Sequence, residues 1–146
     1  MAVRVELTDD AIDPATYHSL LGDDDRVGAQ LWFHGVTRRL TKHDGRSVID
    51  FTELLFYDAH RSMALSELNR LAGDACKRFE IADVVIVHKL GNAPVGQISV
   101  LVGVGSPHRR AAIDAVAWIM DTLKRDVPIW KREQKKSGST HWVHPE

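Results

Sequence analysis

The chain has 146 residues, of which 44% are hydrophobic and 27% are charged, and its formal net charge is −1 at pH 7. This length and composition predict a single globular domain over residues 1–146, with a core that needs no disulfide or structural metal. The balanced charge excludes a general attraction to nucleic acid or acidic lipid, so any anion site must be local. Cys76 is the only cysteine, which excludes an internal disulfide and fits a reducing cytoplasm. No apolar stretch is long enough for a transmembrane helix.

The N-terminal half predicts short strands and one helix. Residues 3–7 alternate like a strand, and Asp13 followed by Pro14 predicts the cap and first residue of a helix that runs to about Leu21. A second strand is expected over 27–33. The segment VTRRLTKHDGRS is rich in charges and turn formers, which predicts a loop and makes it a candidate lid. A long strand then resumes over 48–57.

The C-terminal half predicts two longer helices and a strand pair. Apolar residues at helical spacing predict an amphipathic helix over 59–78. The apolar runs 81–88 and 97–105, joined by GNAPVG, predict an antiparallel pair. A third helix should start with Ser106 as N-cap and Pro107 as first residue, and it must end before Pro128. QKKSGST, residues 134–140, predicts a mobile loop. The order βαββαββα favours an α+β fold with a largely antiparallel sheet.

Three residues in the first turn of this third helix are candidates for an anion site. His108, Arg109 and Arg110 stand where the helix dipole disfavours positive charge. Free backbone N–H groups and cationic side chains at a helix start form a good phosphate site. Position alone does not decide between such an anion site and side chains that only face water.

Lys124 is the second candidate centre of chemistry. It follows Met120 by one helical turn, at the end of the predicted apolar stripe, so we expect its amine to be partly buried. A desolvated amine close to other cations can lose its proton near neutral pH and act as a base or nucleophile. The commoner alternative is a snorkelling lysine that interacts with the helix C-terminus. Lys131 follows in PIWKRE, beyond the proline break.

Other possible sites are weak. Cys76 lies beside an apolar stripe and is expected in the core, and Gly103-Val104-Gly105 lacks the spacing of a dinucleotide fingerprint or a P-loop. The histidines in HWVH have no accompanying Cys or acidic cluster. We therefore expect no metal and no cofactor, including ATP and NAD.

Several motifs together resemble the large, catalytic subunit of molybdopterin synthase. They follow one another between about Val27 and Val143 as VGAQLWFHGVTR, LLFYDAHRSMA, VHKLGNAPVGQISVLVGVGSPHRRAAIDAVAWIMDTLKRDVPIWKRE and HWV. The combination of Phe-x-Gly-x-x-Arg, His-Arg at a helix start, Asp-x-x-Lys and Pro-x-Trp-Lys-x-Glu is highly specific.

This resemblance implies a sulfurtransferase with an α/β hammerhead-type fold. Such a subunit forms a homodimer with a small ubiquitin-like subunit docked at each end, which makes a heterotetramer. The small subunit carries a C-terminal glycine thiocarboxylate, whose tail enters a pocket of the large subunit. Two such tails supply the sulfurs that turn cyclic pyranopterin monophosphate into molybdopterin, in molybdenum cofactor biosynthesis. Cys76 is not a suitable sulfur source, which agrees with an external donor.

The resemblance also implies the roles of individual residues. Lys124 and Lys131 would be catalytic. The residues that would hold the substrate's phosphate and pterin or complete the pocket are Arg38, Arg39, His108, Arg109, Arg132 and Glu133. One cation is missing, because Val36 stands where bacterial relatives often have lysine; Arg39 or Lys42 would then replace it.

Two other functions stay open. The chain could be a non-catalytic scaffold that docks a ubiquitin-like partner, or an enzyme that acts on another phosphorylated heterocycle. A scaffold would have little use for Lys124, Lys131 and the cationic helix start together. The residues do not decide whether the pocket draws on both protomers.

Overall fold

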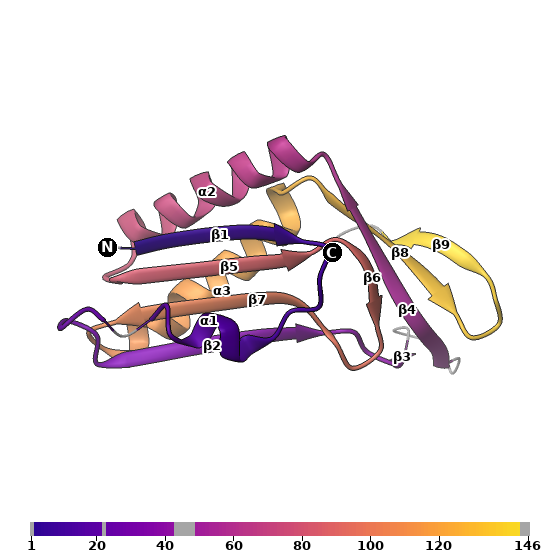
Figure 1. Cartoon of the computed structure of the whole chain (residues 1–146), viewed down its shortest axis with the longest axis horizontal. Coiled ribbons are helices and arrows are strands. Elements are labelled where there is room, and N and C mark those ends of the chain that lie inside the picture. Colours follow the sequence, from indigo (N-terminus) through magenta and orange to yellow (C-terminus); the bar gives the residue numbers. More distant parts are fainter. Residues whose placement is uncertain (1, 22, 43–48, 144–146) are drawn as a thin grey trace.

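The structure is a computed structural model that describes residues 2–21, 23–42 and 49–143 (Figure 1). Two sheets make up its framework: a main sheet in the body of the molecule and a second sheet at one end of it. The helices pack on the main sheet. Within these ranges, no helix is both long enough and apolar enough to cross a membrane.

The main sheet has the strand order β1-β5-β7-β2. Its strands are β1 (Ala2–Thr8), β5 (Asp83–Lys89), β7 (Ile98–Ser106) and β2 (Ala29–Val36). β1 runs parallel to β5, and the other two pairs are antiparallel. β5 and β7 are buried almost throughout, as expected for strands covered on both faces. The predicted β5–β7 pair and the α+β class are therefore confirmed.

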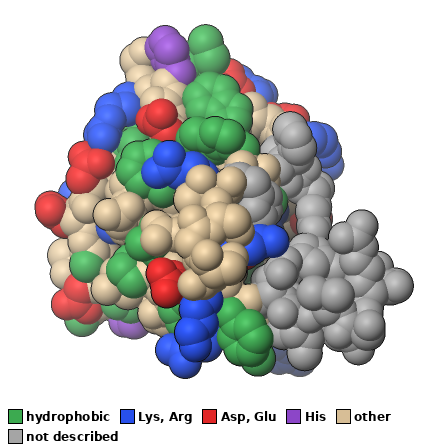
Figure 2. Space-filling model, turned by 90° about the vertical axis from the view of Figure 1, so that its right-hand side faces the viewer, with side chains coloured by type: hydrophobic (Ala, Val, Ile, Leu, Met, Phe, Trp, Pro, Cys, Tyr) green, Lys and Arg blue, Asp and Glu red, His purple; other side chains and the backbone are tan. Residues whose placement is uncertain are grey.

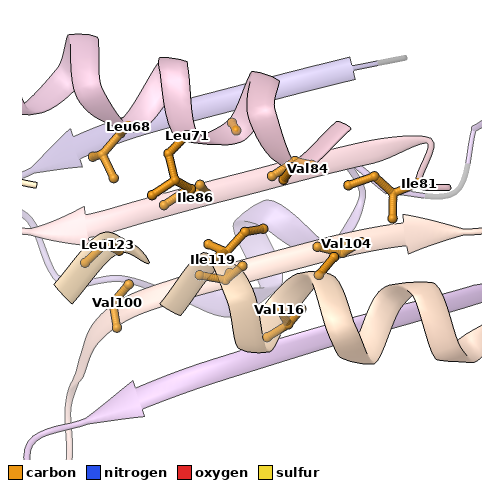
Figure 3. Close-up of a cluster of buried hydrophobic side chains, with 14 of the residues drawn as sticks. Leu68, Leu71, Ile81, Val84, Ile86, Val100, Val104, Val116, Ile119 and Leu123 are labelled. Carbon is orange, nitrogen blue, oxygen red and sulfur yellow. The ribbon is translucent and has the colours of Figure 1, made fainter. Parts of the chain in front are cut away.

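Two long helices, α2 (Arg61–Arg78) and α3 (Arg109–Asp126), pack on the main sheet, and the core lies between them and the sheet (Figure 3). α1 (Pro14–His18) contributes to a smaller cluster on the other face. Each fully buried aliphatic side chain stabilises the fold by about 1.5–3 kcal/mol. The buried core residues labelled in Figure 3 are Leu68, Leu71, Ile81, Val84, Ile86, Val100, Val104, Val116, Ile119 and Leu123.

The second sheet joins distant parts of the chain. Its strand order is β3 (Leu40–Lys42), β4 (Ile49–Ala59), β8 (Ile129–Lys135) and β9 (Thr140–Val143), and β6 (Gly91–Pro94) also pairs with β4. All of these pairs are antiparallel. β4 is the centre of this sheet, because it pairs with β3 and β6 as well as with β8.

Two predicted helix boundaries were wrong. α1 ends at His18 rather than near Leu21, although Asp13 caps it as expected by accepting a hydrogen bond from the Ala15 N–H (3.1 Å). α3 begins at Arg109, because Ser106 is still the last residue of β7 and its hydroxyl donates to the His108 carbonyl (2.5 Å). The end of α3 before the proline is confirmed.

Four strands lie where loops or turns were predicted, or beyond the last predicted helix. β3 lies in the candidate lid, whose residues 43–48 are outside the described part of the chain, and β6 lies in the predicted turn GNAPVG. The predicted loop 134–140 contains the end of β8 and the start of β9. Only a short turn separates these strands, and the Lys135 N–H donates to the Ser139 carbonyl across it (2.9 Å). At the centre of this turn Gly138 has φ +87°, which suits glycine.

Candidate functional site

The candidate residues of α3 lie at its two opposite ends. His108 is the N-cap of this helix, and Lys124 lies in its last turn. Sixteen residues at 1.5 Å rise each separate them by roughly 24 Å. Figure 3 shows Leu123 beside Val100, near the start of β7, whereas His108 follows the end of β7. One protomer therefore does not bring His108 and Arg109 together with Lys124.

The end of the molecule that carries the second sheet has three candidate cations from separate elements. Arg38 follows β2, whose last residue, Val36, pairs with Ile98 at the start of β7. Lys124 lies near the end of α3, and Lys131 is the third residue of β8, just beyond the α3–β8 connection. Figure 2 looks onto this end of the molecule and shows Lys and Arg side chains among hydrophobic ones.

The two lysines differ in exposure. Lys124 is exposed, so the expected partial burial does not occur in the isolated chain. The reason is helical geometry: the buried side of α3 passes through Leu123, and the next residue is rotated by about 100°. Lys131 is half-buried in β8. Desolvation of Lys124 would thus require something to cover it.

The alternation of β8 separates residues that the sequence places side by side. Lys131 and Glu133 leave one face of the strand and Arg132 leaves the other. Arg132 is exposed, and its guanidinium lies over the rings of Phe56 (4.9 Å) and Trp142 (5.8 Å). Arg132 therefore does not line one pocket together with Lys131 and Glu133 in a single protomer.

Glu133 is a buried acidic residue of β8. It is 9% exposed, and its carboxylate accepts a hydrogen bond from the hydroxyl of Thr52 in β4. Buried carboxylates require such partners. This contact ties β8 to β4 and orients the face that carries Lys131.

A cavity of about 340 Å³ lies at the base of the β3–β4 hairpin. Of the residues that the resemblance implies, only Arg39 lines it; the Lys42 side chain is outside the described part. The preceding Thr37 is buried, and its hydroxyl has no hydrogen-bond partner among the described residues. The cavity is lined by Arg39, Phe51, Thr52, Glu53, Val95 and Lys136.

At the opposite end, α3 begins with exposed positive side chains. His108 caps the helix without a side-chain hydrogen bond, and the first turn has no acidic residue. Arg109 and Arg110 are both exposed, and a guanidinium nitrogen of Arg110 lies 3.8 Å from an Asp114 carboxylate oxygen. This geometry keeps the helix start open to an anion. A second cavity, of about 350 Å³, adjoins it and is lined by Arg26, Glu80, Ile81, Ala82 and Pro107.

A buried polar group between the two sheets was missed by sequence reasoning. His88, at the end of β5, is 5% exposed and packs edge-on against the Tyr57 ring of β4 (centroids 5.0 Å apart, planes at 75°). Burial lowers the pKa of His88 to about 4, although its ring nitrogen Nδ1 lies 2.8 Å from the Lys89 carbonyl, a contact that acts in the opposite direction. The imidazole is therefore neutral at pH 7. A histidine that ends a continuous apolar strand is the signal that could have identified it.

Cys76 packs against the core as expected. It is half-buried on α2, and burial raises the pKa of its thiol, which makes it a poor nucleophile. Within the described ranges, no group of three or more His, Cys, Asp or Glu residues could hold a metal ion. His144 lies outside those ranges, and the side chain of His141 is not among the described side chains.

Comparison with known proteins identifies the family. The MoaE protein family matches residues 7–126, so the chain belongs to this family. It is 42% identical over 131 residues to a molybdopterin synthase catalytic subunit from Drosophila sechellia. The aligned region covers 89% of this chain but only 34% of that longer relative. The resemblance seen in the sequence is therefore confirmed.

Solved structures agree on the fold. Molybdopterin synthase from Staphylococcus aureus superposes with a TM-score of 0.80 and 28% identity, over 94% of this chain and 95% of that one. A complex of subunits 1 and 2 of molybdopterin-converting factor from Helicobacter pylori contains a chain with a TM-score of 0.73, over 95% of this chain and 89% of that one. At 18% identity, this second likeness speaks for the fold alone.

Proposed function

We propose that this chain is the catalytic subunit of a molybdopterin synthase. It would transfer sulfur from the C-terminal thiocarboxylate of a small ubiquitin-like subunit to cyclic pyranopterin monophosphate. The observation that carries the proposal is the placement of Lys124 and Lys131 at one end of a chain that belongs to the MoaE family. No observation favours the scaffold or another heterocycle as substrate.

The chemistry of the reactants suits this end of the molecule. Both the thiocarboxylate and the phosphorylated pterin are anions, and three separate segments of the chain carry Arg38, Lys124 and Lys131 at this end. Preorganised cations stabilise such charges most strongly once water is excluded. Because Lys124 is exposed in the isolated chain, an arriving tail would desolvate it and prepare its amine for proton transfer. Half-buried Lys131 would mainly position the substrate.

In this proposal, the cationic start of α3 contributes to the site of a second copy of the chain. His108 and Arg109 lie roughly 24 Å from Lys124 in the same chain, too far to hold one small substrate. A two-fold axis perpendicular to α3 near its middle would place two α3 helices antiparallel, so that the start of one lies near the end of the other. We therefore infer a homodimer with two sites, each of which draws on both protomers.

The partner completes the assembly. One small subunit would dock at each end of the dimer, and its tail glycines would be indispensable. The cytoplasmic location expected from the composition is part of the same proposal. Light scattering should show a dimer that gains two small subunits; a monomer whose mass does not change on addition of the partner would contradict the assembly.

The decisive experiment combines the chain with a thiocarboxylated small subunit and cyclic pyranopterin monophosphate. Molybdopterin should form, and the same partner with an ordinary C-terminal carboxylate should yield none. Calorimetric titration with nucleotides provides the specificity control. Absence of molybdopterin together with tight binding of another phosphorylated heterocycle would overturn the proposed function.

A further inference from the structure

His88 lies at the junction between the two sheets, on the face of the main sheet that α3 covers. Side chains alternate along β5, so His88 leaves the same face as Ile86, which packs in the core against the two long helices. In the β5–β7 register His88 is paired with Val100. Val100 belongs to the same core cluster as Leu123 of α3, and Figure 3 shows the two side by side. His88 is therefore close to the end of the helix that carries Lys124.

The chain fixes the orientation of the His88 ring where it leaves β5. Nδ1 of this ring lies 2.8 Å from the Lys89 carbonyl, and a carbonyl only accepts hydrogen bonds, so Nδ1 carries the proton of the neutral imidazole. Three residues after His88, Gly91 pairs with Tyr57 in the β4–β6 ladder. The φ of Gly91 is +79°, which suits glycine at this turn. The turn from His88 to Gly91 thus joins the main sheet to β4.

The Tyr57 ring connects His88 to Lys131. The two rings are in edge-on contact, with centroids 5.0 Å apart and planes at 75°, which is a preferred arrangement of ring pairs. Tyr57 is also directly opposite Lys131 in the β4–β8 register, so the two side chains leave the same face of the second sheet, with Cβ atoms about 4.5–5.5 Å apart. The flexible stem of Lys131 therefore starts next to a ring that buried His88 holds in place.

We propose that His88 is a positioning residue for sulfur transfer, which acts through the Tyr57 ring to set where the Lys131 amine lies relative to Lys124. This rests on the proposed function, in which both lysines serve one site. Lys124 is carried by α3, which packs on the main sheet, whereas Lys131 is carried by the second sheet. A contact across the junction between the sheets therefore constrains their separation. Displacement of a substrate-positioning group by about 1 Å can cost a hundredfold in rate.

Two substitutions separate the ring of His88 from its hydrogen bond. His88→Phe keeps an aromatic edge against Tyr57 and removes the donor to Lys89, whereas His88→Asn keeps a short N–H donor and removes the ring. The single-turnover rate of molybdopterin formation, at saturating thiocarboxylated partner and precursor, should fall at least about tenfold in His88→Asn. In His88→Phe it should stay within about threefold of the wild-type rate. Small-subunit binding should not change in either variant. Equal rates for the two variants, or the opposite order, would overturn the proposal.

Tyr57→Leu tests the same contact from the other side, and Tyr17→Leu is its matched control. Tyr17 is also packed against the main sheet, but it lies on α1, in the cluster on the other face. Both substitutions should lower the melting temperature, and only Tyr57→Leu should lower the rate, again at least about tenfold. Equal rates for these two variants would contradict the positioning role. This pair carries the test even if His88→Asn does not fold.

Coupling to Lys131 separates positioning from a general loss of structure. In a Lys131→Ala background, Tyr57→Leu should cause no further loss of rate, because the residue on which the ring acts is gone. A fully additive loss would overturn the proposal. An active wild type whose His88→Asn and Tyr57→Leu variants keep its rate would reject this inference alone, whereas a wild type that forms no molybdopterin would reject the proposed function.

Discussion

Lys124 is the residue at which a chemical role can best be separated from an electrostatic one. Arginine at this position stays charged, whereas lysine can lose its proton once it is covered. Lys124→Ala and Lys124→Arg should both lower single-turnover molybdopterin formation by about a hundredfold or more, the usual scale for a positioned proton-transfer group. Lys131→Ala should cost less. Exposed Lys77, on α2, provides the control variant. Near-normal activity of Lys124→Arg would leave the residue only a fixed charge.

Thr37 carries a buried hydroxyl without a partner among the described residues. Thr37→Val keeps the shape of the side chain and removes the unsatisfied group, so it should raise the free energy of unfolding by about 1 kcal/mol. Thr52→Val is the matched opposite, because it removes a hydrogen bond to buried Glu133 and should lower that free energy by about 1–3 kcal/mol. Urea unfolding measures both. A loss of stability in Thr37→Val would mean that its hydroxyl has a partner.

At the scale of elements, the length of α3 predicts complementation between two inactive variants. In one variant His108 and Arg109 are substituted, and in the other Lys124 is substituted. If each site takes one end of α3 from each protomer, a mixed dimer has one intact site and one doubly defective site. Random mixing should then restore about a quarter of wild-type activity. Refolding the two variants together and assaying molybdopterin tests this, with each variant refolded alone as the control. Activity no higher than that of the single variants would contradict a site that is shared between protomers.

The elements also differ in how far local sequence determines them. The helices and the buried strands β5 and β7 follow from apolar spacing and turn residues, which are local signals. β3, β6, β8 and β9 lack such signals. β6 and β8 exist because β4 offers hydrogen-bonding groups to segments far away in the sequence. β3 forms by pairing with the nearby start of β4, and β9 forms because β8 is already in place.

For the whole molecule, the burial of His88 between the two sheets predicts that acid lowers the stability of the fold. His88 has a pKa of about 4 in the folded chain and its ordinary value near 6.5 when unfolded. Between these values the unfolded chain binds a proton that the folded chain does not, so stability present above pH 6.5 is lost as the pH falls toward 4. The loss from this group is roughly 3 kcal/mol. Denaturant unfolding between pH 7.5 and 4 should show a flatter profile for His88→Gln than for the wild type. Parallel profiles would contradict this assignment.

The sequence by itself determined the family, the α+β class and the order of the main elements, and it supplied the candidate site residues. These properties depend on residue types and on short spacings along the chain, both of which are visible without the folded structure. Only the tertiary structure decided how those residues are distributed. The rise of α3 separates His108 from Lys124, the alternation of β8 turns Arg132 away from Lys131, and the rotation of the last helical turn exposes Lys124. Tyr57 and His88 meet across two sheets because distant strands pack together, and no local pattern encodes such a contact.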